Sequence, residues 1–87
     1  MKKELTFKLS KHALEQMGLR GISEEVVRKI LLNPDQIKID DGKKVYQSLV
    51  ENGSSLIRIF VNPKKIPRIV ITVYKTSKIK EYYESKI

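Results

Sequence analysis

Hydrophobic and polar residues alternate near the start of the chain and again over most of its second half, a period typical of β-strands. Leu5, Phe7 and Leu9 predict a short first strand over residues 4–9. Further strands are expected from Gln36 onward and over residues 44–50, 55–61 and 68–75. Asp41-Gly42 and Asn52-Gly53 are hairpin-turn dipeptides, and residues 62–67 form a looser connection. These later strands therefore form an antiparallel meander.

Between the first strand and the meander, apolar residues recur every three or four positions, as in a helix. Ser10 is expected to cap a helix over residues 11–20, and Gly21 ends it in the left-handed conformation. Ser23 is expected to cap a second helix, which Asn33-Pro34 ends. The two apolar stripes are Ala13, Leu14 and Met17, and Val27, Ile30 and Leu31.

The end of the chain predicts one more helix. Thr76 or Ser77 can cap it, and Ile79 and Tyr83 then lie four residues apart on one side. The expected fold class is α+β. A short N-terminal strand comes first, two helices pack on one face of an antiparallel β-meander, and a C-terminal helix follows. Residues 1–87 are expected to form a single domain.

Tight turns also fix which residues share a face of the sheet, because they place Ile37 opposite Tyr46 and Gln47 opposite Arg58. The expected core face carries Ile37, Ile39, Tyr46, Ile57, Ile59 and Val61, joined by Ile69, Ile71 and Val73. The opposite face carries Val45, Gln47, Leu49, Leu56, Arg58 and Phe60, joined by Val70, Thr72 and Tyr74.

Composition excludes several kinds of chemistry. The 87 residues include no Cys and one His, so a disulfide framework, a thiolate metal site and Cys-based catalysis are excluded. No cofactor and no metal ion are expected. Because no apolar run approaches the roughly 20 residues that span a bilayer, and no signal peptide is visible, we expect a cytoplasmic protein without a membrane partner.

Charge is the feature that points to a partner. The net charge is +8, and no acidic residue lies between Glu51 and Glu81. That window holds Arg58, Lys64, Lys65, Arg68, Lys75, Lys78 and Lys80. A basic half of this kind is typical of proteins that contact nucleic-acid phosphates. The alternative interpretation is a lysine-rich surface that serves solubility.

Four residues are candidates for chemistry. Arg58 lies in a strand that is apolar on both faces, where a guanidinium must be paired or must face a wet cleft. If Arg58 is functional, its guanidinium is suited to binding phosphate. The alternative is that it forms a structural ion pair. Tyr74 is a candidate proton donor or an edge aromatic, and His12 is a candidate proton carrier or plain polar surface. Arg20 is a second candidate cation or a helix-end charge.

The order of several short motifs resembles a family of small uncharacterised bacterial domains. The matching runs are Ser10-Lys11-His12-Ala13-Leu14-Glu15, Arg20-Gly21-Ile22-Ser23, Asn33-Pro34, Val45-Tyr46, Leu56-Ile57-Arg58 and Thr72-Val73-Tyr74-Lys75. That family resembles the RelE-like toxin superfamily, which shares the fold of the barnase, EndoU and colicin nucleases. Members often carry an arginine directly after the glutamate of the first helix, where this chain has Gln16.

The resemblance implies a metal-independent endoribonuclease with catalytic groups on an open sheet face, and it marks His12, Arg20, Arg58 and Tyr74 as catalytic. His12 and Tyr74 are the acid/base candidates, and the two arginines would stabilise the phosphorane. RNA contacts are expected from Lys11, Gln47, Lys64, Lys65, Arg68, Thr72, Lys75 and Lys78. The expected partners are RNA, including ribosome-bound mRNA, and an antitoxin protein.

Two other functions compete with the nuclease. One is a nucleic-acid-binding module that uses the same lysines without catalysis. The other is a protein-interaction domain, including a homo-oligomer formed through apolar residues around Arg58, namely Val45, Leu49, Leu56 and Phe60.

Overall fold

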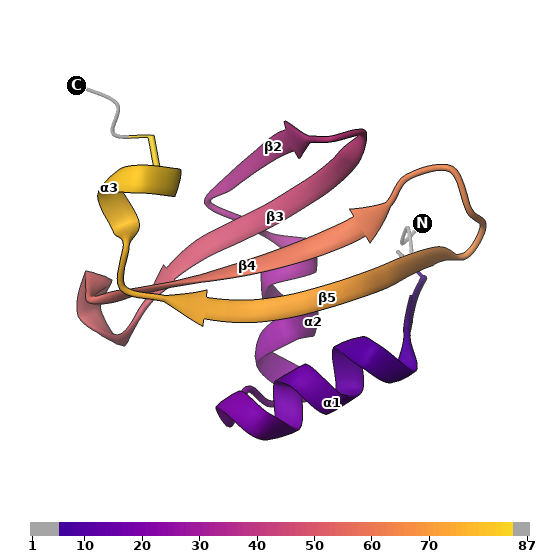
Figure 1. Cartoon of the computed structure of the whole chain (residues 1–87), viewed down its shortest axis with the longest axis horizontal. Helices are drawn as coiled ribbons and strands as arrows, with labels where there is room; N and C mark the ends of the chain where they lie inside the picture. The colour runs from indigo at the N-terminus through magenta and orange to yellow at the C-terminus, as the bar shows by residue number, and fades with distance from the viewer. Residues whose placement is uncertain (1–5, 85–87) are drawn as a thin grey trace, which may run out of the picture.

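The structure, a computed structural model, describes residues 6–84 and has the expected α+β class. In chain order the elements are β1 (Phe7–Leu9), α1 (Lys11–Arg20), α2 (Glu24–Leu32), β2 (Gln36–Asp40), β3 (Lys43–Val50), the 3-10 turn η1 (Glu51–Gly53), β4 (Ser55–Asn62), β5 (Arg68–Thr76) and α3 (Ile79–Tyr82). The strands form one sheet in the order β1-β5-β4-β3-β2 (Figure 1).

The sheet is mixed. β2 to β5 form the predicted antiparallel meander, whereas β1 pairs parallel with β5 through Phe7↔Arg68 to Leu9↔Val70. A parallel pair needs a crossover connection, and here α1, α2 and the meander separate the two strands. Of the predicted first strand, residues 7–9 are confirmed, while residues 4 and 5 lie outside the described part of the chain.

The predicted starts of α1 and α2 at Ser10 and Ser23 are confirmed. The predicted cap of the C-terminal helix by Thr76 or Ser77 is wrong, because Lys78 precedes α3 and no side chain caps it. The Ser10 hydroxyl oxygen accepts a hydrogen bond from the Ala13 N–H at 3.0 Å and also donates to the Ile71 carbonyl at 3.0 Å. The same side chain therefore caps α1 and ties it to β5. Gly21 ends α1 at φ +67°, the left-handed conformation expected of it. In the predicted stripe of α1, Ala13 and Met17 are buried, but Leu14 is 49% exposed.

The hairpin turns set the predicted register. Asp41 and Gly42 have φ of +54° and +76°, as a two-residue hairpin loop requires, and Ile37 lies opposite Tyr46. The β3–β4 connection is longer, with Val50↔Ser55 as its last pair, but it still places Gln47 opposite Arg58.

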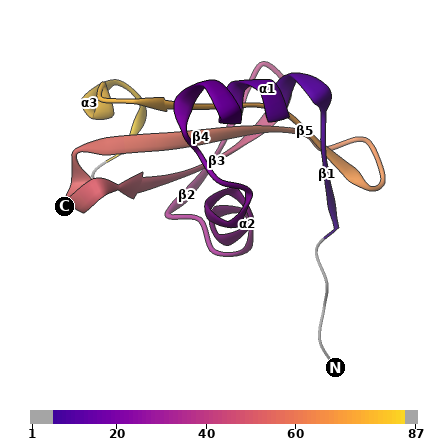
Figure 2. The same ribbon diagram turned by 90° about the horizontal axis from the view of Figure 1, so that it is seen from below.

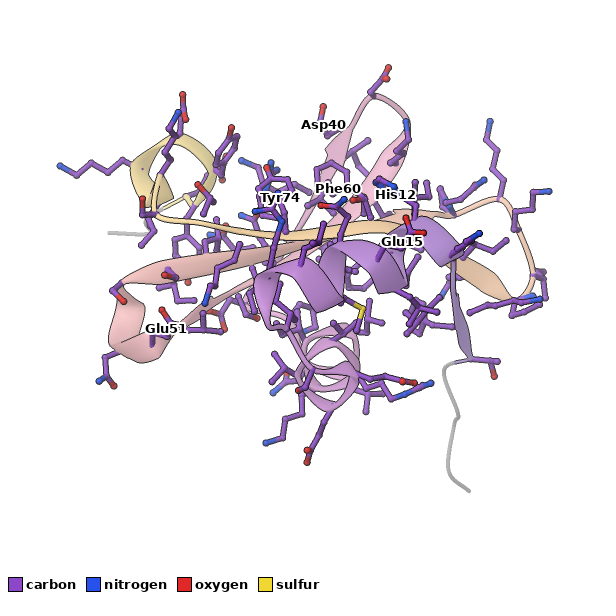
Figure 3. The ribbon with its side chains drawn as sticks, turned by 60° about the horizontal axis from the view of Figure 1, so that its bottom comes forward. His12, Glu15, Asp40, Glu51, Phe60 and Tyr74 are labelled. Atoms are coloured by element: carbon purple, nitrogen blue, oxygen red, sulfur yellow. The ribbon has the colours of Figure 1, made fainter. Side chains whose placement is uncertain are left out.

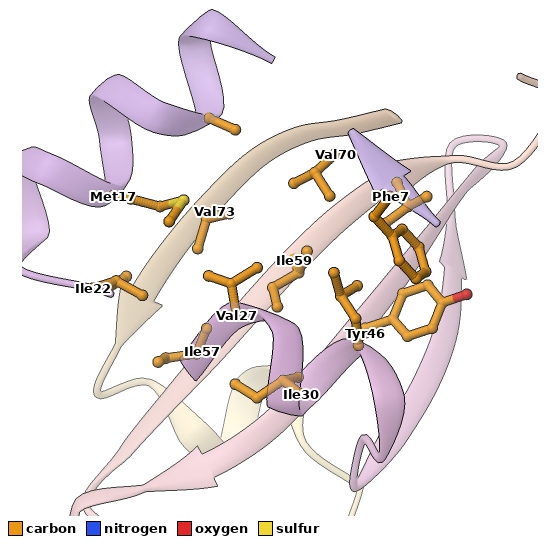
Figure 4. Packing of buried hydrophobic residues seen from close by; sticks show 13 residues of the cluster. Phe7, Met17, Ile22, Val27, Ile30, Tyr46, Ile57, Ile59, Val70 and Val73 are labelled. Atoms are coloured by element: carbon orange, nitrogen blue, oxygen red, sulfur yellow. The ribbon is translucent and has the colours of Figure 1, made fainter. Parts of the chain in front are cut away.

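The main core lies between one face of the sheet and the two N-terminal helices (Figure 4). Its members include Met17 from α1 and Val27 from α2 over Ile59 and Val73 of the sheet. In Figure 2, α1 runs alongside β5, and α2, which packs against β3, is drawn lower in the view.

Two parts of the predicted core face are wrong. Ile37 and Ile39 are 49% and 69% exposed, because α2 packs over β3 and not over the edge strand β2. The β4–β5 register also shifts between Phe60↔Thr72 and Val61↔Val70, which places an extra residue, Ile71, in β5.

That shift reverses the expected faces at the start of β5. Val70 is fully buried in the core, and Ile69 and Ile71 are only partly buried outside the core cluster. On the C-terminal side of the shift in β5, Tyr74 pairs with Arg58 and therefore lies on the predicted face.

The second sheet face is covered, whereas the resemblance implied an open one. Residues Ile79–Glu84, here named the C-terminal segment, contact this face through the hydrogen bonds described below. In Figure 1, α1 and α3 lie on opposite sides of the β4–β5 hairpin. Val45 and Leu56 on the covered face have no exposed surface. Of the four apolar residues in the homo-oligomer interpretation, these two are therefore not available at the surface, whereas Leu49 and Phe60 are partly exposed.

Candidate functional site

The candidate site is centred on Arg58, in the middle of β4. Its neighbours across the sheet are Gln47 on β3 and Tyr74 on β5. The guanidinium Nε donates to Gln47 Oε1 at 2.9 Å, and Nη1 donates to the Tyr74 hydroxyl at 2.8 Å. Arg58 is 5% exposed and Gln47 is fully buried. Three adjacent strands thus hold the guanidinium in one orientation.

Aromatic rings surround the guanidinium carbon. The ring centroids of Phe60, Tyr74 and Tyr82 lie 5.2, 5.9 and 4.2 Å from it. Phe60 and Tyr74 stack on each other at 5.9 Å with an interplanar angle of 29°, and Figure 3 labels both side chains. Aromatic faces attract cations within about 6 Å, so the rings partly replace the water that Arg58 has lost.

No carboxylate balances this charge in the part of the chain that the structure describes. The ion pairs found there join Arg28 to Glu24, Lys38 to Glu84, Lys43 to Asp41 and Lys75 to Glu51. Arg58 Nε and Nη1 bond to neutral partners, and Nη2 bonds to no described residue. A buried cation without an anion is costly. The site is therefore suited to an anion that approaches the guanidinium.

The C-terminal segment closes the site from outside. The Tyr82 carbonyl accepts from Gln47 Nε2 at 2.9 Å and from Lys38 Nζ at 3.1 Å. The Gln36 carboxamide bonds to both backbone groups of Glu84, accepting from its N–H at 3.2 Å and donating to its carbonyl. The pKa of the Tyr82 hydroxyl is raised, mainly by the neighbouring Tyr74 hydroxyl and then by Glu81. Tyr82 therefore stays protonated over Arg58 at neutral pH.

The structure brings together only part of the predicted catalytic set. Arg58 and Tyr74 are in contact, whereas His12 and Arg20 are exposed on α1. Figure 3 shows α1, with its labelled His12, alongside the strand that carries Tyr74. In residues 6–84, no hydrogen bond or ion pair joins either α1 residue to the Arg58 cluster.

The predicted RNA-contacting residues are distributed along the whole molecule. Gln47 and Thr72 share the face of Arg58, and Lys11 is exposed at the start of α1. Lys64, Lys65 and Arg68 lie at the β4–β5 connection, and Lys75 and Lys78 lie at the other end of β5. Nine residues of strand separate the two ends by about 27 Å, so the cations flank the Arg58 site on two sides.

One of these cations is already paired. Lys75 Nζ lies 2.7 Å from Glu51 Oε2, and this hydrogen bond lowers the pKa of the Glu51 carboxyl. Lys75 is therefore less available to an external anion than the exposed lysines.

Sequence reasoning missed Gln36, Lys38 and Tyr82. The register predicted from the Asp41-Gly42 turn would have found the first two. Gln36 lies opposite Gln47, and Lys38, two residues further along β2, lies on the same face of the sheet. No local signal marks Tyr82, since its position depends on how the chain turns back after β5.

Metal and membrane chemistry receive no support from the described residues. Residues 6–84 contain no group of three or more His, Asp or Glu side chains that could hold a metal ion. None of the helices in that range is long and apolar enough to cross a membrane.

The fold and the site define a small α+β domain with a buried arginine held among glutamine and tyrosine side chains. Residues 9–75 match the family described as Domain of unknown function (DUF4258), and the chain belongs to this family. The matched region includes Gln47, Arg58 and Tyr74 and ends before the C-terminal segment. No curated protein and no solved structure matches the chain.

Proposed function

We propose that this domain binds RNA and cleaves its backbone as a toxin-like endoribonuclease, with Arg58 as the phosphate-binding group. The observation that carries the proposal is the buried guanidinium, which two neutral partners orient and no described carboxylate neutralises. A planar guanidinium binds phosphate oxygens through paired N–H groups, and a partly dry site strengthens that attraction. The proposed partners are RNA and an antitoxin protein that protects the host.

The proposed reaction is transesterification at phosphorus. The ribose 2′-oxygen attacks, its proton passes to a general base, the bond from phosphorus to the 5′-oxygen breaks, and that oxygen takes a proton from a general acid. The products are a 2′,3′-cyclic phosphate and a 5′-hydroxyl. Arg58 would stabilise the negative phosphorane, and Tyr74, hydrogen-bonded to Arg58, would handle one proton. His12, on the helix beside β5, is the candidate for the other.

A second candidate is RNA binding without cleavage. It is favoured by the placement of His12 and Arg20, which make no hydrogen bond or ion pair with the Arg58 cluster in residues 6–84. Without a second proton-transferring group, the site would hold a phosphate and leave the backbone intact. Cleavage products distinguish the two functions directly.

The test uses an end-labelled single-stranded RNA and a DNA strand of the same sequence, which lacks the attacking 2′-hydroxyl. Gln47→Glu places a carboxylate where Oε1 now accepts from Arg58, and it neutralises the site without removing the arginine. Lys29→Gln is the matched control, because it changes the net charge by the same amount at an exposed residue of α2 that is not among the predicted RNA contacts. Binding is measured by fluorescence anisotropy and cleavage by gel electrophoresis.

We expect wild type and Lys29→Gln to bind both strands and to cut only the RNA. Gln47→Glu is expected to lose binding, and Tyr74→Phe to cut more slowly by about 10²–10⁴. Equal RNA binding by Gln47→Glu and Lys29→Gln would show that Arg58 does not hold the phosphate. Binding with the RNA left intact would establish the non-catalytic module.

A further inference from the structure

The C-terminal segment is held on the sheet mainly through its own backbone. Gln47 and Lys38 donate to the Tyr82 carbonyl, and the Gln36 carboxamide bonds to both backbone groups of Glu84. The side chain of the segment that stacks on the site is Tyr82, whose ring centroid lies 4.2 Å from the guanidinium carbon of Arg58. The segment thus occupies the site that we assign to phosphate.

Its attachment is weak compared with that of the other helices. α3 is a single turn without a side-chain cap and without a buried residue. The ion pair from Lys38 to Glu84 is 3.7 Å long, and the Glu84 side chain is 73% exposed. Segments with few buried apolar contacts open at a small fraction of the free energy of global unfolding. The segment can therefore leave the sheet while the main core stays folded.

The remaining parts of the site do not depend on the segment. Arg58, Gln47 and Tyr74 are fixed by β3, β4 and β5, and all three fall inside the family region at residues 9–75. The segment begins after that region ends. Removing Tyr82 from the guanidinium would uncover a preformed cation instead of disrupting the fold.

We infer that residues Ile79–Glu84 are an autoinhibitory cover, in which the Tyr82 ring competes with RNA for Arg58. This inference rests on the proposed function, since it concerns access to the same site. A cover lowers apparent affinity by the fraction of molecules that are open. If about one molecule in ten is open, removal of the cover tightens binding about tenfold.

The experiment compares wild type, Tyr82→Ala and Tyr82→Phe with the same labelled single-stranded RNA. Phenylalanine keeps the aromatic ring over Arg58, whereas alanine removes it. We expect Tyr82→Ala to bind about tenfold more tightly and Tyr82→Phe to bind like wild type. Circular dichroism and the thermal midpoint establish that both variants are folded.

A second measurement uses the wild-type chain alone. Amide hydrogen exchange is followed for residues 79–84 with and without RNA, and displacement of the cover is expected to speed exchange there. Slower exchange would mean that RNA binds on top of the closed segment, and the inference would be wrong.

The outcomes separate the cover from the function. If wild type binds RNA and Tyr82→Ala binds equally or more weakly, the cover is refuted and the RNA site stands. If neither protein binds RNA at any concentration tested, the proposed function fails, and the inference fails with it.

Discussion

Arg58 and Ile59 are neighbours on β4 whose side chains lie on opposite faces, and they should respond differently to mutation. Ile59 has no exposed surface in the main core, and Arg58 is 5% exposed on the covered face. If Arg58 is kept for ligand binding, its replacement by an apolar residue of similar length should cost little stability. We therefore compare Arg58→Met with Ile59→Ala.

The expected magnitude for Arg58→Met follows from opposing contributions. The variant loses two hydrogen bonds from a charged donor, each worth about 1.5–3 kcal/mol, and it loses the contacts with three aromatic rings. It also removes the desolvation penalty of the buried cation, which amounts to several kcal/mol. The net change in the free energy of unfolding is expected to stay below about 2 kcal/mol in either direction.

Ile59→Ala has no such compensation. It removes buried methyl and methylene groups and leaves a cavity, and such changes cost about 2–5 kcal/mol. Urea unfolding followed by circular dichroism measures both variants, and the same preparations are tested for RNA binding. We expect Arg58→Met to be folded but unable to bind RNA, and Ile59→Ala to bind RNA wherever it is folded.

One result would refute this reasoning. If Arg58→Met lost as much stability as Ile59→Ala, the arginine would be a structural element of the sheet. The absence of a described carboxylate partner for Arg58 would then be no argument for an anionic ligand.

Two further predictions concern stability alone. Ser10→Ala removes both the cap on Ala13 N–H and the bond to the Ile71 carbonyl, and a loss of about 1–2 kcal/mol is expected in urea unfolding. The hydrogen bond from Lys75 lowers the pKa of Glu51, so this contact stabilises the fold above the unfolded pKa and is lost as pH falls through the lower, folded pKa. The difference in thermal midpoint between wild type and Glu51→Gln is therefore expected to shrink from neutral pH to about pH 3, and a constant difference would contradict it.

Local chemistry explains why most elements could be predicted from the sequence. Ser10 and Ser23 cap their helices, and Gly21 and Gly42 adopt the positive φ that their positions require. The Asn52-Gly53 signal correctly places the centre of the β3–β4 turn, so the neighbours Gln47 and Arg58 were predicted correctly although the connection is longer than two residues.

Long-range packing explains what could not be predicted. The irregularity opposite Phe60 and Val61 carries no sequence signal here, and it moved Val70 into the core. The exposure of Ile37 and Ile39 depends on how far α2 reaches across the sheet, which no local pattern encodes.

The C-terminal segment was the hardest part to predict for the same reason that it can be displaced. Besides the Tyr82 ring on Arg58, its contacts are mainly hydrogen bonds from distant side chains to its backbone, and such bonds place few demands on the residues of the segment. A segment held by its own apolar side chains would have been buried with a larger gain in free energy, whereas Ile79 and Tyr83, the pair that predicted a helix here, are only partly buried. Weak sequence specification and weak attachment therefore have one physical origin, and both are expected of a cover that must open over Arg58.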